Sequence, residues 1–123
     1  MAAQPGVTGR PTGTVTMLFT DIEGSTRLLQ RLGPTIYGSL LGDHHRLIRR
    51  SVAACSGVEV KTEGDAFFVV FPSAPDAVNA AVQAQLELAS REWPDDSTVA
   101  VRMGISQRRG FHQRWRERRH GRA

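Results

Sequence analysis

Residues 14–26 have the sequence TVTMLFTDIEGST, and this stretch decides how the fold is expected to begin. Its first seven residues form a short β-rich apolar run, which predicts a buried strand over residues 14–20. Gly24, Ser25 and Thr26 then open a helix, which the hydroxyl of Ser25 or Thr26 is able to cap. Asp21 therefore lies at the carboxyl end of an apolar strand, directly before the start of a helix.

Two helical segments are predicted after this turn. Leu28, Leu29 and Leu32 are expected to line the inner face of the first segment, which Gly33 and Pro34 end. The second segment covers residues 35–54, where apolar side chains recur at helical spacing: Ile36, Leu40, Leu47, Ile48 and Val52.

Two strands, a helix and a last strand are predicted next. Residues 58–62 alternate as a strand, residues 67–71 (FFVVF) form a more apolar one, and residues 63–66 join them as a tight hairpin. Ser73 is positioned to cap the following helix. We expect its buried stripe to consist of Val78, Ala81, Val82, Leu86 and Ala89. The last strand is expected over residues 98–105, with Val99, Val101, Met103 and Ile105 on one face.

This order of elements predicts an α+β fold, a ferredoxin-like βαββαβ sandwich whose first helix is split. The sandwich is complete by Ile105. Residues 1–13, rich in Gly, Pro and Thr, are expected to form a flexible arm. Residues 106–123 lack periodicity, carry seven arginines and are expected to be a disordered tail.

Charge is unevenly divided along the 123 residues, whose net charge is +4. Residues 1–105 have a net charge of −2, and residues 106–123 have a net charge of +6. A basic tail can contact phosphates weakly, and Trp115 could stack on a base. The slightly acidic body gives no reason to expect nucleic acid as its partner, and deletion of residues 106–123 would separate the two hypotheses.

No apolar run is long enough to cross a bilayer, and the N-terminus lacks the apolar segment of a secretory signal. Cys55 is the single cysteine, so no internal disulfide is expected. We therefore expect a cytoplasmic protein without a membrane partner.

Cys55 is interpreted as a packing residue. Of His44 and His45 on the second helical segment, one is expected to be partly buried and the other to face solvent.

Asp21 and Asp65 are the carboxylates that suggest chemistry. Asp65 lies at the tip of a hairpin whose strands are expected to pair beside the first strand. Two carboxylates at one sheet edge repel each other unless a cation joins them, and Mg²⁺ prefers such oxygen ligands. The N–H groups of a helix start suit a phosphate. A metal–triphosphate site is one interpretation; the other is that Asp21 only caps a helix and Asp65 only makes a turn.

The segments FTDIEGST at residues 19–26 and KTEGDAFF at residues 61–68 resemble the two metal motifs of class III adenylate and guanylate cyclase catalytic domains of the bacterial type. The resemblance extends from about residue 13 to residue 105. It implies that Asp21, the Ile22 carbonyl and Asp65 hold two Mg²⁺ or Mn²⁺ ions. It also implies that the triphosphate lies on the backbone of Ile22, Glu23, Gly24, Ser25 and Thr26.

Lys61 matches the lysine that recognises the base in this family, which favours ATP as substrate and cyclic AMP with pyrophosphate as products. Taken alone, Lys61 could also be a solvated strand residue. Since the metals and the base are bound by different subunits in this family, the resemblance implies a head-to-tail homodimer.

The resemblance ends at Ile105. The family continues with a segment that supplies a ribose-positioning Asn and a phosphate-stabilising Arg, and neither can be assigned here. This change of character suggests truncation or a frameshift, and it predicts low or no turnover. An alternative is a degenerate nucleotide-binding module of the kind that stands at the N-terminus of larger transcriptional regulators.

Overall fold

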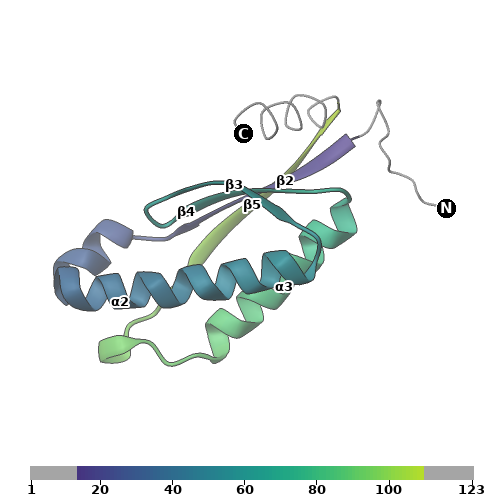
Figure 1. The fold of residues 1–123 in the computed structure, drawn as a ribbon. Coiled ribbons are helices and arrows are strands. Elements are labelled where there is room, and N and C mark those ends of the chain that lie inside the picture. Colours follow the sequence, from purple (N-terminus) through teal and green to yellow (C-terminus); the bar gives the residue numbers. More distant parts are fainter. Residues whose placement is uncertain (1–13, 110–123) are drawn as a thin grey trace.

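The computed structural model describes residues 14–109, which form one antiparallel sheet with two helices on the same side of it (Figure 1). The strands lie in the order β3-β4-β2-β5, so β2 is central and pairs with both β4 and β5. The prediction of a flexible arm at residues 1–13 falls outside the described residues. The predicted disordered tail, residues 106–123, falls outside them too except for residues 106–109, which are the end of the last strand and not disordered. The elements are β2 (Thr14–Ile22), α2 (Ser25–Ala54), β3 (Val58–Glu63), β4 (Ala66–Phe71), α3 (Ala74–Ser90), a 3₁₀ turn η1 (Pro94–Asp96) and β5 (Val101–Arg109).

The predicted α+β sandwich with a split first helix is confirmed. Within α2, Gly33 leaves helical geometry at φ 85° and ψ 162°, and Pro34 follows it. The predicted cap is wrong. Gly24 occupies the N-cap position in a left-handed conformation, φ 67°, and no side chain caps the helix. The missing Cβ lets the backbone turn directly from β2 into α2.

The core lies between the sheet and the two helices. Leu28 and Leu32 are buried as predicted, as are Leu40, Leu47, Ile48 and Val52 of the longer segment. Leu29, expected on the inner face, and Ile36, a member of the apolar pattern of the second segment, are 37% and 44% exposed. They lie on either side of the non-helical residue Gly33, so one apolar stripe does not continue unbroken from the first segment to the second.

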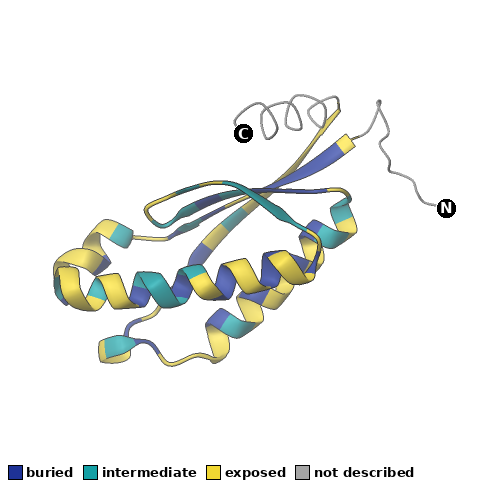
Figure 2. Ribbon diagram, viewed as in Figure 1, coloured by how far each residue is buried: buried dark blue, intermediate teal, exposed yellow. Residues whose placement is uncertain are grey.

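The buried stripe of α3 differs from the prediction by about one residue. Alanines face the core together with Leu88, whereas Val78, Val82 and Leu86 are 46%, 51% and 66% exposed. Figure 2 shows buried and exposed positions alternating along both helices. Packing against α2 brings the two helices close together, and small side chains allow that approach. The buried residues are Ala77, Ala80, Ala84 and Leu88. Ser73 caps α3 as predicted, by accepting a hydrogen bond from the Asp76 N–H at 3.3 Å.

The last strand also differs from the prediction. β5 begins at Val101 and continues to Arg109, four residues beyond the strand end predicted at Ile105. Its register runs from Val101 opposite Ile22 to Arg109 opposite Thr14. Backbone hydrogen bonds to the first half of β2 stabilise the added residues of β5. The strand can therefore continue where its side chains do not alternate between apolar and polar. Of the side chains predicted to share one face of this strand, Val99 and Val101 are buried, but Ile105 is 43% exposed.

The face of the sheet turned away from the helices is called the open face here. In the strand register Lys61 lies opposite Phe68, Phe68 opposite Phe19, and Phe19 opposite Gly104, which places the four in one row across this face. The rings of Phe19 and Phe68 stack with centroids 4.8 Å apart, and Phe19 is 46% exposed. Between residues 14 and 109, neither helix has an apolar stretch long enough to span a bilayer.

Candidate functional site

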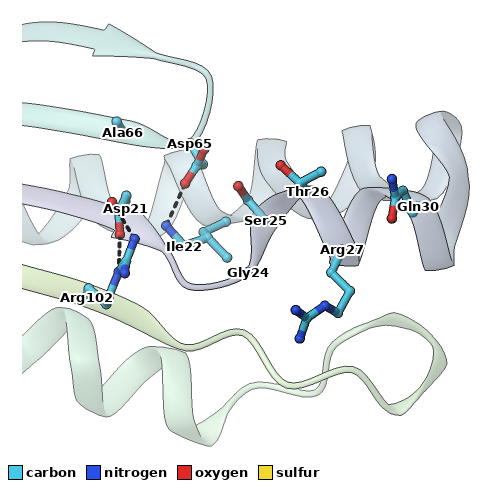
Figure 3. A pocket seen from close by; sticks show the side chains of 10 residues that line it. All are labelled: Asp21, Ile22, Gly24, Ser25, Thr26, Arg27, Gln30, Asp65, Ala66 and Arg102. Atoms are coloured by element: carbon cyan, nitrogen blue, oxygen red, sulfur yellow. Dashed lines mark hydrogen bonds and ion pairs between the residues drawn. The ribbon is translucent and has the colours of Figure 1, made fainter.

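A cleft of about 530 Å³ opens where the end of β2, the start of α2, the β3–β4 hairpin and β5 meet (Figure 3). Most of the residues predicted for the site line it: Asp21, Ile22, Gly24, Ser25, Thr26 and Asp65. Arg27, Gln30, Ala66 and Arg102 complete the lining. Glu23 and Lys61 were predicted for the site but do not line this cleft.

Asp65 is brought to the cleft by a two-residue turn between β3 and β4. Gly64 has φ 58°, a left-handed value that a residue with a side chain adopts at a cost. The Ile22 N–H donates a hydrogen bond of 2.6 Å to Asp65 Oδ2 across 43 positions of sequence. This bond fixes the Asp65 carboxylate beside the end of β2, next to Asp21.

Asp21 is held differently, by the guanidinium of Arg102 on β5. Arg102 Nε lies 2.8 Å from Asp21 Oδ1, and Arg102 Nη2 lies 3.1 Å from Oδ2, so the pair is bidentate. Both side chains are well exposed, 65% for Arg102 and 41% for Asp21. Arg102 was not among the predicted site residues, although the β2–β5 register places it directly opposite Asp21.

The start of α2 offers fewer free backbone donors than predicted. The Ile22 N–H is bound to Asp65, and the Glu23 N–H donates to the Ala100 carbonyl at 2.7 Å. The first helical hydrogen bond runs from the Leu28 N–H to the Gly24 carbonyl at 3.0 Å. Since no side chain caps the helix, the N–H groups just before Leu28 are the donors available to an anion at this end.

The donor set fits a hard divalent cation that completes its coordination with phosphate or water. Asp21 and Asp65 present carboxylate oxygens in one cleft, and Mg²⁺ and Mn²⁺ favour oxygen ligands. Among residues 14–109, no group of three or more His, Cys, Asp or Glu side chains surrounds one point. The two carboxylates therefore suit a cation that a ligand brings with it, rather than one held entirely by protein side chains.

Lys61 lies outside the cleft, on the open face. Its side chain is 66% exposed, and Nζ is 3.6 Å from Glu63 Oε1. A second hollow of about 400 Å³ adjoins the cleft, with which it shares Asp21, Ala66 and Arg102, and it extends along Phe19 and Gly104. Lys61 does not line this hollow either, so it does not meet the carboxylates of its own chain.

His44 and His45 are both more buried than predicted, because His44 is fully buried and His45 is half-buried rather than facing solvent. Neither ring nitrogen of His44 has a hydrogen-bond partner among the described residues. Burial first and the neighbouring His45 second lower the pKa of His44 to about 4, and the Asp65 carboxylate opposes this shift. His44 is therefore a neutral ring, packed near Phe67 beneath the hairpin.

Two converging carboxylates beside an uncapped helix start define a class of site that suits a metal-bound anion. The sequence profile of the adenylate and guanylate cyclase catalytic domain matches residues 7–113. The chain belongs to this family.

Curated relatives are similar over most of the chain. It is 38% identical over 115 residues to an adenylate cyclase of Lachancea kluyveri, and the alignment covers 83% of this chain and 6% of that protein. It is 42% identical over 91 residues to an adenylate cyclase of Schizosaccharomyces pombe, covering 74% of this chain and 5% of that protein. The chain thus spans only a small part of the length of these relatives.

Solved structures share the fold. An adenylate cyclase of Trypanosoma brucei in its monomeric state superposes with a TM-score of 0.72 at 29% identity, covering 80% of this chain and 58% of that one. A guanylate cyclase domain of Catenaria anguillulae in complex with GTP superposes with a TM-score of 0.71 over 80% of this chain and 58% of that one. Its 19% identity supports the fold alone.

Proposed function

We propose that residues 14–109 form the metal- and triphosphate-binding half of an adenylate cyclase site, which acts on cytoplasmic ATP. The observation that carries this proposal is the convergence of Asp21 and Asp65 beside the uncapped start of α2. A carboxylate pair that binds a divalent cation and a helix start that binds an anion suit the two parts of a metal–triphosphate complex.

Asp21 and Asp65 hold the divalent ions in this proposal, with the Ile22 carbonyl as a further oxygen ligand. When bound, two such ions supply Lewis-acid activation of the attacking ribose hydroxyl and neutralise the triphosphate charge. The free N–H groups between Gly24 and Leu28 orient the triphosphate. Ile22 and Glu23 contribute little as donors, because their N–H groups already have partners.

Arg102 completes the charge pattern of the cleft. In the structure its guanidinium neutralises Asp21. If Asp21 held a cation, Arg102 would no longer be needed to neutralise it and would be a cleft-wall donor for phosphate oxygens. Arg27, in the first turn of α2, also lines the cleft. The cleft therefore offers cationic side chains to the triphosphate in addition to the helix start.

Base recognition is proposed to come from a second copy of the chain. Lys61 lies in the row of Phe68, Phe19 and Gly104 on the open face and does not reach the cleft of its own chain. A head-to-tail dimer across the open face would bury Phe19 and bring Lys61 of one copy toward the cleft of the other. A lysine N–H there suits an acceptor nitrogen of adenine, which supports ATP as the nucleotide.

The 123-residue chain on its own is proposed to bind Mn²⁺ and ATP with little or no turnover. Donors that stabilise a transition state each contribute about 10²–10³ in rate, and the ribose-positioning Asn and phosphate-stabilising Arg of the family have no counterpart assigned here. The alternative, a regulatory module that binds a nucleotide without converting it, also predicts binding without turnover. Measuring cyclic AMP production separates the two.

The test is cyclic AMP production and ATP binding by the purified chain with Mn²⁺, with Asp65→Ala as control. We expect Mn²⁺-dependent ATP binding that Asp65→Ala abolishes, and cyclic AMP near the detection limit. Binding that is unchanged in Asp65→Ala would overturn the proposed site. Cyclic AMP production by the wild-type chain that disappears in Asp65→Ala would support the site and overturn the proposal of low turnover.

A further inference from the structure

The β3–β4 hairpin carries Asp65 on a turn of two residues, Gly64 and Asp65, between Glu63 and Ala66. Gly64 is in a left-handed conformation and brings no side chain, so the Asp65 carboxylate, bound to the Ile22 N–H, is the anchor that the turn itself supplies. A displacement of about 1 Å at a reacting or ligating group can cost on the order of 10²-fold in function. A second contact, on the Gly64 side of the turn, would restrict the position of the Asp65 carboxylate further.

His45 supplies a direct contact to this turn from α2. Its Nε2 lies 2.8 Å from the Gly64 carbonyl oxygen. Because a carbonyl only accepts, the ring donates, and Nε2 carries the proton. The ring also stands edge-on to Phe67 on β4, with centroids 5.2 Å apart and an interplanar angle of 87°. His45 thus touches the turn through a polar bond and the following strand through an apolar contact.

Arg49, one helical turn further along α2, holds the hairpin from the other strand. Its guanidinium lies 5.4 Å from the centroid of the Phe67 ring and makes bidentate hydrogen bonds of 2.8 and 3.1 Å to Glu59 on β3. Glu59 also accepts a hydrogen bond from the Thr62 hydroxyl. Through His45 and Arg49, one face of α2 contacts β3, β4 and the turn between them.

We propose that His45 is the positioning residue of Asp65. The Gly64 carbonyl is fixed by His45 from the helix side, and the next residue's carboxylate is fixed by the Ile22 N–H from the β2 side. Two supports on consecutive residues hold the carboxylate in place before any metal arrives. The proposal rests on the proposed function in one respect, because Asp65 must be a metal ligand for its position to affect metal affinity.

Two substitutions of His45 separate its hydrogen bond from its packing. His45→Phe keeps an aromatic ring beside Phe67 and removes the donor. His45→Gln places an amide N–H near the original Nε2 and restores the donor. Arg46→Gln is the matched control on the same helix, since Arg46 is exposed and its only ion pair among the described residues is with Asp43.

The measurements are Mn²⁺ affinity, followed by electron paramagnetic resonance, and amide hydrogen exchange of the hairpin in the metal-free protein. We expect His45→Phe to weaken Mn²⁺ binding by about tenfold, as for the loss of other groups that orient a ligand, and to speed exchange of the hairpin amides. His45→Gln should recover most of both, and Arg46→Gln should change neither. Equal Mn²⁺ affinity and exchange in His45→Phe and wild type, or no rescue by His45→Gln, would overturn the inference.

Nitrogen-15 chemical shifts of the His45 ring in the wild-type protein provide a test that needs no variant. They should show a proton on Nε2, and an unprotonated Nε2 would contradict the inference even if the variants failed to fold. The outcomes also separate the two proposals. Absent Mn²⁺ binding in wild type would refute the proposed function, whereas the exchange and chemical-shift results would still decide whether His45 positions the turn.

Discussion

The two carboxylates of the cleft are supported in opposite ways. Asp65 accepts a backbone N–H at 2.6 Å and sits on a turn that α2 also contacts through His45. Asp21 is exposed and is matched by a side-chain cation, Arg102, that comes from the far end of the sequence. One carboxylate is therefore fixed by a backbone contact, and the other is neutralised by an exposed side chain.

This difference gives the two carboxylates different parts in ligand binding. An exposed ion pair is worth little to stability, so exchanging Arg102 for a metal ion costs the fold almost nothing. The bond between Asp65 and Ile22 shapes the cleft whether or not a metal is present. We call the surroundings of each carboxylate the Asp65 end and the Asp21 end of the cleft. We infer that the Asp65 end is preorganised and that the Asp21 end rearranges when a metal ion replaces Arg102 as the partner of Asp21.

The largest effect on Mn²⁺ affinity is expected from removing either carboxylate. Comparing the two substitutions tests whether Asp65 and Asp21 are supported differently. Asp65→Asn and Asp21→Asn should each weaken Mn²⁺ affinity by about 100-fold, because a charged ligand is lost from a site that has only two. Asp65→Ala should in addition lower the free energy of unfolding by about 1–2 kcal/mol, since the Ile22 N–H loses its acceptor.

The matched substitution Asp21→Ala should leave the free energy of unfolding nearly unchanged. Urea unfolding without metal measures this, and Asp65→Asn controls for charge because its amide oxygen still accepts from Ile22. Equal destabilisation by Asp65→Ala and Asp21→Ala would contradict the difference between the two ends.

Acid should weaken the fold beneath the Asp65 end through His44. Its pKa of about 4 in the folded protein lies below the ordinary value of 6.5, so the folded state binds this proton less readily than the unfolded state. The stability that neutral His44 provides is complete above pH 6.5, declines as pH falls toward 4, and is lost below that. At 1.36 kcal/mol for each pKa unit, the loss amounts to roughly 3 kcal/mol.

Urea unfolding at a series of pH values between 6.5 and 5 isolates this contribution. Glu59, whose pKa is lowered chiefly by its hydrogen bond from Arg49, loses its stabilising charge only at lower pH. His44→Leu should flatten the pH dependence in this window, and Arg46→Gln should retain it. A slope that persists unchanged in His44→Leu would show that the buried ring does not carry this effect.

The sequence predicted where both carboxylates lie better than it predicted the contacts that hold them, for a physical reason. A strand end, a helix start and a Gly-Asp turn are local signals, so the placement of Asp21 and Asp65 at one sheet edge could be expected. The pairing of Asp21 with Arg102 spans 81 positions and depends on the register between β2 and β5. Apolar patterns fix a register only loosely, so this contact was missed.

The same limit explains the errors on α3 and in the phosphate-binding turn. Helical spacing in α3 offers two apolar stripes, and the more hydrophobic one, with Val82 and Leu86, was predicted to be buried. The close packing of helices selected the alanine stripe instead. The Glu23 N–H was assigned to a phosphate, but it is used by Ala100, from a segment whose position no local pattern reveals.

The smallest effect, and the sharpest test of a movable cation, is expected from Arg102→Gln. Removing the guanidinium frees Asp21, so Mn²⁺ alone should bind several-fold more tightly. The same substitution should weaken Mn²⁺-dependent ATP binding, because a donor for the triphosphate is lost. The melting temperature without ligand should stay unchanged, since the ion pair is exposed to solvent.

The opposite signs of these two effects distinguish an exchangeable cation from a structural one. The gain in Mn²⁺ affinity should shrink at high salt, which screens the charge of Arg102 in the wild-type protein. Arg31→Gln is a suitable control, because Arg31 also forms an exposed ion pair, with Asp95, and does not line the cleft. If Arg102→Gln weakened Mn²⁺ and ATP binding alike, the ion pair would be holding Asp21 in its working position, and both carboxylates would be preorganised.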